Sequence, residues 1–215
     1  MAYAYPAAAA SSSAPTVSIV GPQFCAPHRV ELAVTSSAGG DFVVTDVNSD
    51  NILFKVKGSG FFSMDDHDRR VLIDATGNPI VTLQPKSMSL HDRWQVFRGD
   101  SSESSDLIFT TKRTSMFQLK TKLHVFLANN TKEDVCDFKV KSSYSENSCV
   151  IYAGQSSTIV AQKHKKHTVQ SVLAGKDKFM VTVNPNIDYA FIVALIVILD
   201  GLYTAALQEV LENLI

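Results

Sequence analysis

The sequence predicts a mainly β fold: a closed barrel of about twelve antiparallel strands that encloses one hydrophobic helix near the C-terminus. Two features of the chain predict it. From His28 to Val183, short runs of β-forming residues alternate with turn residues, and one unbroken apolar run, Tyr189 to Leu199, then follows. With 215 residues, of which 45% are hydrophobic, the chain is long enough for one domain with a sizeable core.

Each expected strand is a short apolar or alternating run, and most are bounded by Gly, Asn or Pro. In one of them, Cys136, Phe138 and Val140 alternate with Asp137 and Lys139, which is typical of an antiparallel strand with one face in water. A closed sheet is favoured because it leaves no exposed edge and surrounds the apolar run. The expected strands are residues 29–34, 42–47, 52–56, 70–74, 80–83, 93–97, 107–111, 123–127, 135–140, 149–153, 158–161, 169–173 and 179–183.

The apolar run between Asp188 and Asp200 is expected to form a helix inside the barrel. Its eleven residues, at a rise of about 1.5 Å each, reach about half of a bilayer's hydrocarbon core, and no Lys or Arg follows Lys178. No transmembrane span is therefore predicted. A helix that is apolar on every side has to be buried in protein. We expect it over about residues 187–200, with Asn186 or Asp188 as its N-cap.

The two ends of the chain are expected to lie outside the barrel domain, which is assigned to residues 23–200. Residues 1–22 are rich in Ala and Ser and lack the basic and apolar regions of a secretory signal, which predicts a disordered leader. Residues 201–215 place Leu and Val at one-sided helical spacing, which predicts an amphipathic C-terminal extension. This extension would pack on its own domain or on another subunit.

Several residue patterns have the composition of catalytic or metal sites. His67-Asp68-Arg69 and His91-Asp92-Arg93 place a histidine beside a carboxylate, but neighbours in a strand face opposite sides, and no nucleophile motif accompanies them. His164 and His167 have metal-ligand spacing only on a helix, and the acidic residues 65–68 lack the EF-hand arrangement. We therefore expect solvated turns at these places, and no catalytic residue, metal or cofactor.

Cysteine usage and charge bear on location and partners. Cys25, Cys136 and Cys149 include no CxxC pair, so they predict neither a disulfide framework nor a zinc site, and a cytoplasmic location fits. The net charge of −1 conceals a basic central segment, residues 112–178, with 12 basic and 5 acidic side chains. Nucleic acid is not an expected partner, because aromatic residues do not interleave with this basic segment as a base-stacking surface would require.

The lysines of the central segment form the candidate site. Lys120, Lys122 and His124 share one face of an expected strand, and Lys139 and Lys141 share a face of the next, so a hairpin would bring the two sets together. Such a patch attracts anionic membrane lipid headgroups at about 1 kcal/mol per basic residue, while ordinary solvated lysines are the alternative. The patch also takes in Lys112 and Arg113 and the turn that holds Lys163, Lys165, Lys166 and His167.

Several motifs, in order along the chain, resemble those of the plant LURP-one-related family. The resemblance covers roughly Cys25 to Asp200 and departs from the family pattern after Asp200, where a polar tail is usual. The motifs are residues 41–46 (DFVVTD), 53–57 (LFKVK), 70–80 (RVLIDATGNPI), 91–99 (HDRWQVFRG), 116–127, 149–154 (CVIYAG), 164–169 (HKKHTV) and 184–192 (NPNIDYAFI).

The resemblance implies a tubby-like barrel, similar in fold to the phospholipid scramblases, with twelve strands around a hydrophobic helix. It also implies a plant source and, through a defence-associated member, a part in the response to pathogens. Tubby domains bind phosphoinositide headgroups, but their ligand residues cannot be matched to this sequence one by one, so none is carried over.

Composition, motifs and resemblance together predict a non-enzymatic binding or regulatory module with affinity for anionic or phosphoinositide headgroups. It would be cytoplasmic and peripheral at the plasma membrane. Two alternatives stay open at this point: a scramblase-like lipid-handling activity, and a scaffold for a protein partner.

Overall fold

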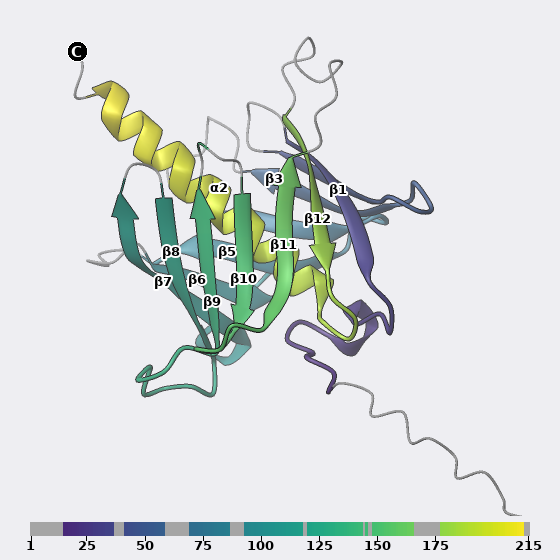
Figure 1. The fold of residues 1–215 in the computed structure, drawn as a ribbon, viewed down its shortest axis with the longest axis horizontal. Helices are drawn as coiled ribbons and strands as arrows, with labels where there is room; N and C mark the ends of the chain where they lie inside the picture. Colours follow the sequence, from purple (N-terminus) through teal and green to yellow (C-terminus); the bar gives the residue numbers. More distant parts are fainter. Residues whose placement is uncertain are drawn as a thin grey trace, which may run out of the picture.

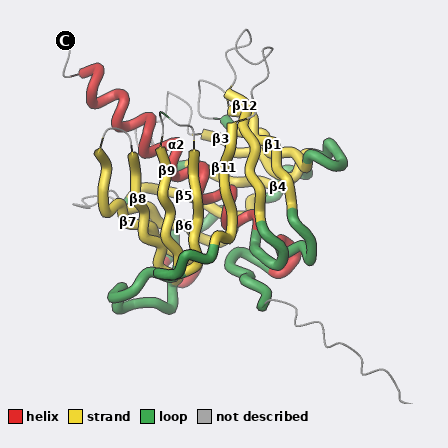
Figure 2. Tube along the Cα trace, in the orientation of Figure 1, coloured by secondary structure: helices red, strands yellow, loops and turns green. Residues whose placement is uncertain are grey.

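The protein is a closed antiparallel β-barrel in the computed structural model, which describes residues 15–36, 41–58, 69–86, 93–117, 120–143, 145, 148–165 and 177–212 (Figures 1 and 2). Each strand pairs with the next one in the chain, and β12 closes the barrel on β1. The prediction of about twelve antiparallel strands around a helix is confirmed. The expected strand at 169–173 lies outside the described residues. The strands are β1 (Val30–Ser36), β2 (Phe42–Asp46), β3 (Ile52–Gly58), β4 (Arg70–Asp74), β5 (Pro79–Pro85), β6 (Arg93–Arg98), β7 (Leu107–Phe117), β8 (Lys120–Leu127), β9 (Phe138–Ser143), β10 (Ser148–Ala153), β11 (Ile159–Lys165) and β12 (Asp177–Val183).

Alternation along the strands separates a dry interior from a wet exterior. In β8, Thr121, Leu123 and Val125 are buried, while Lys122 between them is exposed. The closing pair repeats the pattern, since buried residues of β1 stand opposite buried residues of β12 in the antiparallel register. A period of two therefore fixes which side chains line the core. Short 3-10 helices, η1 (Pro22–Phe24) and η2 (Ser104–Asp106), lie before β1 and β7.

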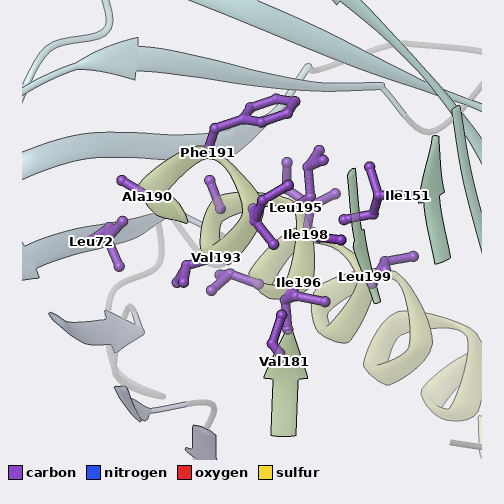
Figure 3. Packing of buried hydrophobic residues seen from close by; sticks show 14 of the residues in the cluster. Leu72, Ile151, Val181, Ala190, Phe191, Val193, Leu195, Ile196, Ile198 and Leu199 are labelled. Carbon is purple, nitrogen blue, oxygen red and sulfur yellow. The ribbon is translucent and has the colours of Figure 1, made fainter. Parts of the chain in front are cut away.

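One helix, α2 (Tyr189–Glu212), threads the barrel (Figure 1). Residues 190–199 are buried on every side, and Figure 3 shows Leu195, Ile196 and Ile198 projecting from different sides of the helix. The Phe191 ring meets Phe138 of the barrel wall at a centroid distance of 4.8 Å. Each large apolar side chain buried here contributes about 2 kcal/mol to stability. By length and composition alone, the first 18 residues of α2 could cross a membrane, but 72% of this stretch is buried inside the barrel.

The helix does not end where the sequence predicted. The expected boundary between a central helix and a separate extension lies at Gly201, yet α2 continues without a break to Glu212, and Leu202 and Tyr203 are buried. Packing explains the difference, because a β-carbon on Gly201 would lie 2.9 Å from Cζ2 of Trp94. Glycine therefore serves here as the residue that lets the helix pass the indole, and burial of the next turn offsets its low helix propensity.

The polypeptide before β1 is packed across the barrel end where α2 begins. The N–H of Val17 donates to the carbonyl of Asn186 (2.8 Å), and Arg98 Nη1 donates to the carbonyl of Val20 (2.8 Å). Val20 is 3% exposed. Assigning all of residues 1–22 to a disordered leader is therefore wrong for residues 15–22, since apolar burial and hydrogen bonds order them. Residues 1–14 lie outside the described part.

Asp188 is the N-cap of α2, one of the two residues expected in that role. Its Oδ1 accepts the N–H of Phe191 (3.0 Å), the side-chain geometry of an N-cap. The other carboxylate oxygen, Oδ2, accepts three further backbone N–H groups, from Ile19 (3.0 Å), Val20 (2.7 Å) and Gly21 (3.0 Å). Asp188 is fully buried, so one carboxylate joins the helix start to the N-terminal segment.

Candidate functional site

The outer surface of β7, β8 and β9 carries a cluster of basic side chains. The antiparallel register places Lys122 opposite Lys141 and His124 opposite Lys139, with Lys112 on the other side of His124. The predicted juxtaposition of the β8 and β9 lysines is thus confirmed. We call this the basic face, which consists of Lys112, Lys120, Lys122, His124, Lys139 and Lys141.

The basic face is a direct result of the strand periodicity. Leu123 on β8 and Val140 on β9 are opposite each other and fully buried, so the residues that flank them in sequence have to point outward. Lys120, Lys122 and Lys141 are exposed, and the remaining three residues are half-buried. Burial of the apolar residues between them therefore fixes the side of the sheet from which these lysines project.

Positive charge on this face is poorly balanced. In the part of the chain that the structure describes, no carboxylate forms an ion pair with Lys122 or Lys141. The pKa of His124 lies below its ordinary value because of burial first, and then because of the charges of Lys139 and Lys112. Opposed like charges across a strand pair destabilise a sheet, so this arrangement has a cost that an anion would relieve.

An acidic residue does border the face at one edge. Glu133 receives two hydrogen bonds from Arg93 of β6, at 2.7 Å from Nη1 and 2.5 Å from Nη2. These bonds, followed by the charges of Arg93, Lys112 and Lys86, hold the pKa of Glu133 below its ordinary value, although burial opposes them. Glu133 is thus occupied by Arg93, and among the described residues no carboxylate forms an ion pair with Lys122 or Lys141.

Tyr152 of β10 extends the basic face. It stands opposite Lys139 in the register of β9 and β10. The ammonium groups of Lys139 and Lys141 both lie 5.5 Å from the centre of its ring, so two cation–π contacts converge on one aromatic side chain. Sequence reasoning missed Tyr152, because its place depends on the pairing of β10 with β9 and not on any local pattern.

A groove of about 410 Å³ lies at the end of the basic face where β8 begins and β9 ends. Three lysines and four serines contribute to its lining: Lys120, Lys122, Lys141, Ser115, Ser142, Ser143 and Ser148. The register sets Lys120 beside Ser143, and Ser143 beside Ser148. The groove thus combines ammonium groups with hydroxyl groups, which is the chemistry that binds oxyanions.

Two other predicted members of the patch stand opposite buried residues and not on the basic face. Lys163 of β11 pairs with buried Cys149 and buried Val181, which places it on the inner side of the barrel wall, and its ammonium lies 3.9 Å above the ring of Phe179. The inclusion of Lys163 in one outer surface with the β8 and β9 lysines is therefore wrong. Arg113 of β7 pairs with buried Leu123, so it does not share the face of the sheet that carries Lys112 and Lys122.

Two more predicted members cannot be assigned to either surface. Lys165 pairs with Phe179, but its side chain is outside the described part. Lys166 and His167 lie outside the described residues altogether.

The residues weighed for catalysis or metal binding give no competing site in the described ranges. No group of three His, Cys, Asp or Glu side chains there could hold a metal ion. His164 Nε2 lies 3.1 Å from Thr182 Oγ1, which in turn donates to Glu31 Oε2 (2.8 Å). Burial raises the pKa of the Cys149 thiol to about 12, so it stays protonated and unreactive at neutral pH. Of the two His-Asp-Arg tripeptides, only Arg69 and Arg93 are described, and the acidic residues 65–68 lie outside these ranges.

Comparison with known proteins gives a consistent result. A family model described as LURP-one-related matches residues 30–200. The Arabidopsis thaliana protein LURP-one-related 15 is 56% identical over 206 residues, which covers 92% of this chain and 93% of the relative. Arabidopsis protein LURP1 is 50% identical, with 84% and 87% covered. An X-ray structure of an Arabidopsis protein superposes with a TM-score of 0.69 at 48% identity, covering 88% of this chain and 99% of that one.

Proposed function

This chain belongs to the LURP-one-related family, and we propose that it is a non-enzymatic binding module that attaches reversibly to anionic lipid headgroups. In this proposal the basic face docks on the cytoplasmic surface of the plasma membrane. The part in plant defence that the family resemblance implies would then act through recruitment to that surface.

One observation carries the proposal: Lys122 and Lys141 stand opposite each other on a face where the described residues offer them no carboxylate partner. Two lysines that serve only solubility would not need to stand opposite each other, because like charges across a strand pair destabilise the sheet. A surface that binds anions gains from it, because juxtaposed charges add their attraction at about 1 kcal/mol each near an anionic membrane. The stability cost and the binding gain therefore have the same origin.

Peripheral attachment fits the rest of the fold. The apolar residues 190–199 are occupied inside the barrel, so they are not available to insert into lipid unless the barrel opens. A handful of lysines provides weak attachment that salt screens, with a Debye length of about 8 Å at physiological ionic strength. The membrane would thus hold the protein by its outer surface alone, and release it as salt rises.

Sedimentation with lipid vesicles tests this function. We expect the protein to pellet with vesicles that contain 20% phosphatidylserine at low salt, and to stay in the supernatant with neutral vesicles. Lys122→Glu with Lys141→Glu should lower the bound fraction at least tenfold, because the change reverses two charges at the centre of the face. The matched control is Lys55→Glu with Lys178→Glu, which makes the same charge change on exposed sites of β3 and β12.

Two results would contradict the function. One is equal pelleting with neutral and anionic vesicles. The other is an equal loss of binding in the two double variants, which would mean that net charge and not the basic face attracts the protein. Both variants should unfold at the temperature of the unchanged protein within a few degrees, since all four lysines are exposed.

A further inference from the structure

Ser115 of β7 is an exposed hydroxyl residue beside the lysines of the basic face. It stands opposite Lys122 of β8, which in turn stands opposite Lys141 of β9, so one row across three strands holds a serine and two lysines. Ser115 is exposed and contributes to the lining of the groove together with both lysines. Its neighbour Thr114 donates its hydroxyl to the carbonyl of Lys122 (3.3 Å), whereas no such bond engages the Ser115 hydroxyl within the described residues.

A β-bulge brings Ser115 to this face. The register between β7 and β8 shifts between Arg113 and Ser115, which leaves one extra residue on β7. Arg113 stands opposite buried Leu123, and strict alternation from there would turn residue 115 toward the buried side as well. The extra residue reverses the alternation, so Ser115 shares the outer face with Lys112 and Lys122.

The residues before Ser115 have the charge pattern that basophilic protein kinases recognise. Lys112 and Arg113 precede it by three and two positions. A kinase of this class selects its substrates by pairing such cations with acidic groups beside its catalytic cleft. Ser101 and Ser142 also follow a basic residue by three positions, but both are half-buried and already donate a hydrogen bond, of 2.6 and 3.0 Å. Sequence and exposure therefore both favour Ser115.

The end of β7 that carries Ser115 is the part of the strand that opens most easily. Among the described residues, β7 pairs with β6 only as far as Lys112, and residues 113–117 pair with β8 alone. A strand end with one partner strand opens at a small cost in free energy. Opening is required, because Arg113 stands opposite a buried residue in the closed barrel and a kinase has to reach it.

We infer that Ser115 is a phosphorylation site, and that its phosphate releases the basic face from anionic lipid; the second part rests on the proposed function. A basophilic kinase would supply the phosphoryl group from ATP. The bond between the γ-phosphorus and the β–γ bridging oxygen breaks, a bond from this phosphorus to Ser115 Oγ forms, ADP leaves, and the hydroxyl proton passes to a base of the kinase. The product carries a charge of about −1.5 to −2 opposite Lys122.

This charge acts on attachment and on folding in opposite directions. It offsets up to two of the five lysine charges of the basic face, so the attraction to an anionic surface falls. Within the sheet, Lys122 gains a cross-strand partner of opposite charge, which stabilises the pair of strands. A loss of membrane binding is therefore expected without a loss of folding, which separates a switch from structural damage.

Treatment of the full chain with the catalytic subunit of cyclic-AMP-dependent protein kinase and magnesium ATP tests the site. Tandem mass spectrometry should find the phosphoryl group on Ser115, and Ser115→Ala should abolish its transfer. Lys112→Gln with Arg113→Gln should slow transfer about tenfold, because it removes both recognised cations, while Ser101→Ala should change the rate less than twofold. Phosphorylation of a free peptide of residues 110–118, but not of the folded chain, would overturn the inference.

Sedimentation with the phosphatidylserine vesicles and a thermal melt test the switch. The phosphorylated protein should bind the vesicles about tenfold more weakly than the unmodified protein, and melt at the same temperature or above it. Ser115→Asp, which adds a single charge, should weaken binding about fivefold. Its matched control is Ser157→Asp, which adds the same charge to an exposed turn between β10 and β11 and should weaken binding less than twofold.

Failure of the inference and failure of the proposed function give different results. Equal pelleting of the phosphorylated and the unmodified protein would overturn the switch and leave the attachment to anionic lipid in place. Equal weakening by Ser115→Asp and Ser157→Asp would also overturn it, because net charge and not position would then decide. No pelleting in any form would contradict the proposed function together with the switch, while phosphate found on Ser115 would still confirm the site. A lower melting temperature of the phosphorylated protein would count against the ion pair with Lys122.

Discussion

Replacing Asp188 with Ala should lower the free energy of unfolding by on the order of 4 kcal/mol, which is a large share of the stability of a single domain. The side chain is fully buried and accepts four backbone N–H groups, three from the N-terminal segment and one from Phe191. Alanine leaves all four donors without a partner, and each buried orphan donor costs about 1–3 kcal/mol unless water reaches it. The loss of the helix cap adds to this cost.

Urea denaturation of Asp188→Ala and Asp188→Asn measures this effect. The Asn variant keeps the size of the side chain but turns one acceptor oxygen into an NH₂ donor, so it should also destabilise the fold by more than about 2 kcal/mol. Asp134→Ala, which removes an exposed loop carboxylate, is the matched control and should change stability by less than about 0.5 kcal/mol. A loss below about 1 kcal/mol for both Asp188 variants would show that the N-terminal segment does not close the barrel end.

Ile196→Asp should prevent folding altogether. Ile196 is 4% exposed on the part of α2 that runs through the barrel, and Figure 3 shows it among the other apolar side chains of the core. An aspartate there loses about 2 kcal/mol of apolar burial and places an unpaired charge in a dry interior, which costs several kcal/mol more. The sum is comparable to the whole stability of a single domain.

Circular dichroism and gel filtration follow the result for Ile196→Asp. Thr204→Asp makes a similar change at an exposed position of the same helix and should leave a folded, monodisperse protein. Ile196→Val should cost only about 0.5–1.5 kcal/mol. If Ile196→Asp folded cooperatively, the helix would not be enclosed by the barrel. That result would contradict both the closed barrel and the proposed peripheral attachment.

Periodicity made much of the fold and half of the candidate site predictable. Strict alternation along β8 and β9 predicted that Lys122 and Lys141 lie on the outer surface. Leu123 follows Lys122 and Val140 precedes Lys141, and both of these apolar residues are buried. The short apolar run predicted an enclosed helix for an equally local reason. These predictions depend only on the period of two and on the need to bury apolar side chains.

Lys163 shows where local pattern fails. Between β10 and β11 the register shifts, with Tyr152 opposite Ile159 and its neighbour Ile151 opposite Ala161, so Val160 is an extra residue on the bulged strand. A one-residue bulge reverses which side chains point inward, and nothing in the sequence marks it. Lys163 therefore pairs with buried residues, whereas its place in the sequence predicted a turn that belonged to the basic patch.

Long-range contacts account for the other differences. The N-terminal segment is ordered by Asp188, about 170 positions away, and a run of Ala and Ser before it suggests the opposite. The low helix propensity of glycine predicts that a helix ends at Gly201. In the structure the indole of Trp94 leaves room only for a glycine there, and the next turn of the helix is buried. Propensity is a weak indicator wherever such tertiary packing decides the outcome.

Hydrogen–deuterium exchange on anionic vesicles tests most directly the central claim, that this protein binds membranes by its outer basic face while its apolar helix stays inside the barrel. Addition of vesicles should slow exchange in β8 and β9, which carry Lys122 and Lys141, and leave α2 residues 190–199 as strongly protected as in the free protein. Faster exchange in α2 on vesicles, with no added protection of β8 and β9, would mean that the barrel opens and inserts its helix, and would contradict the account.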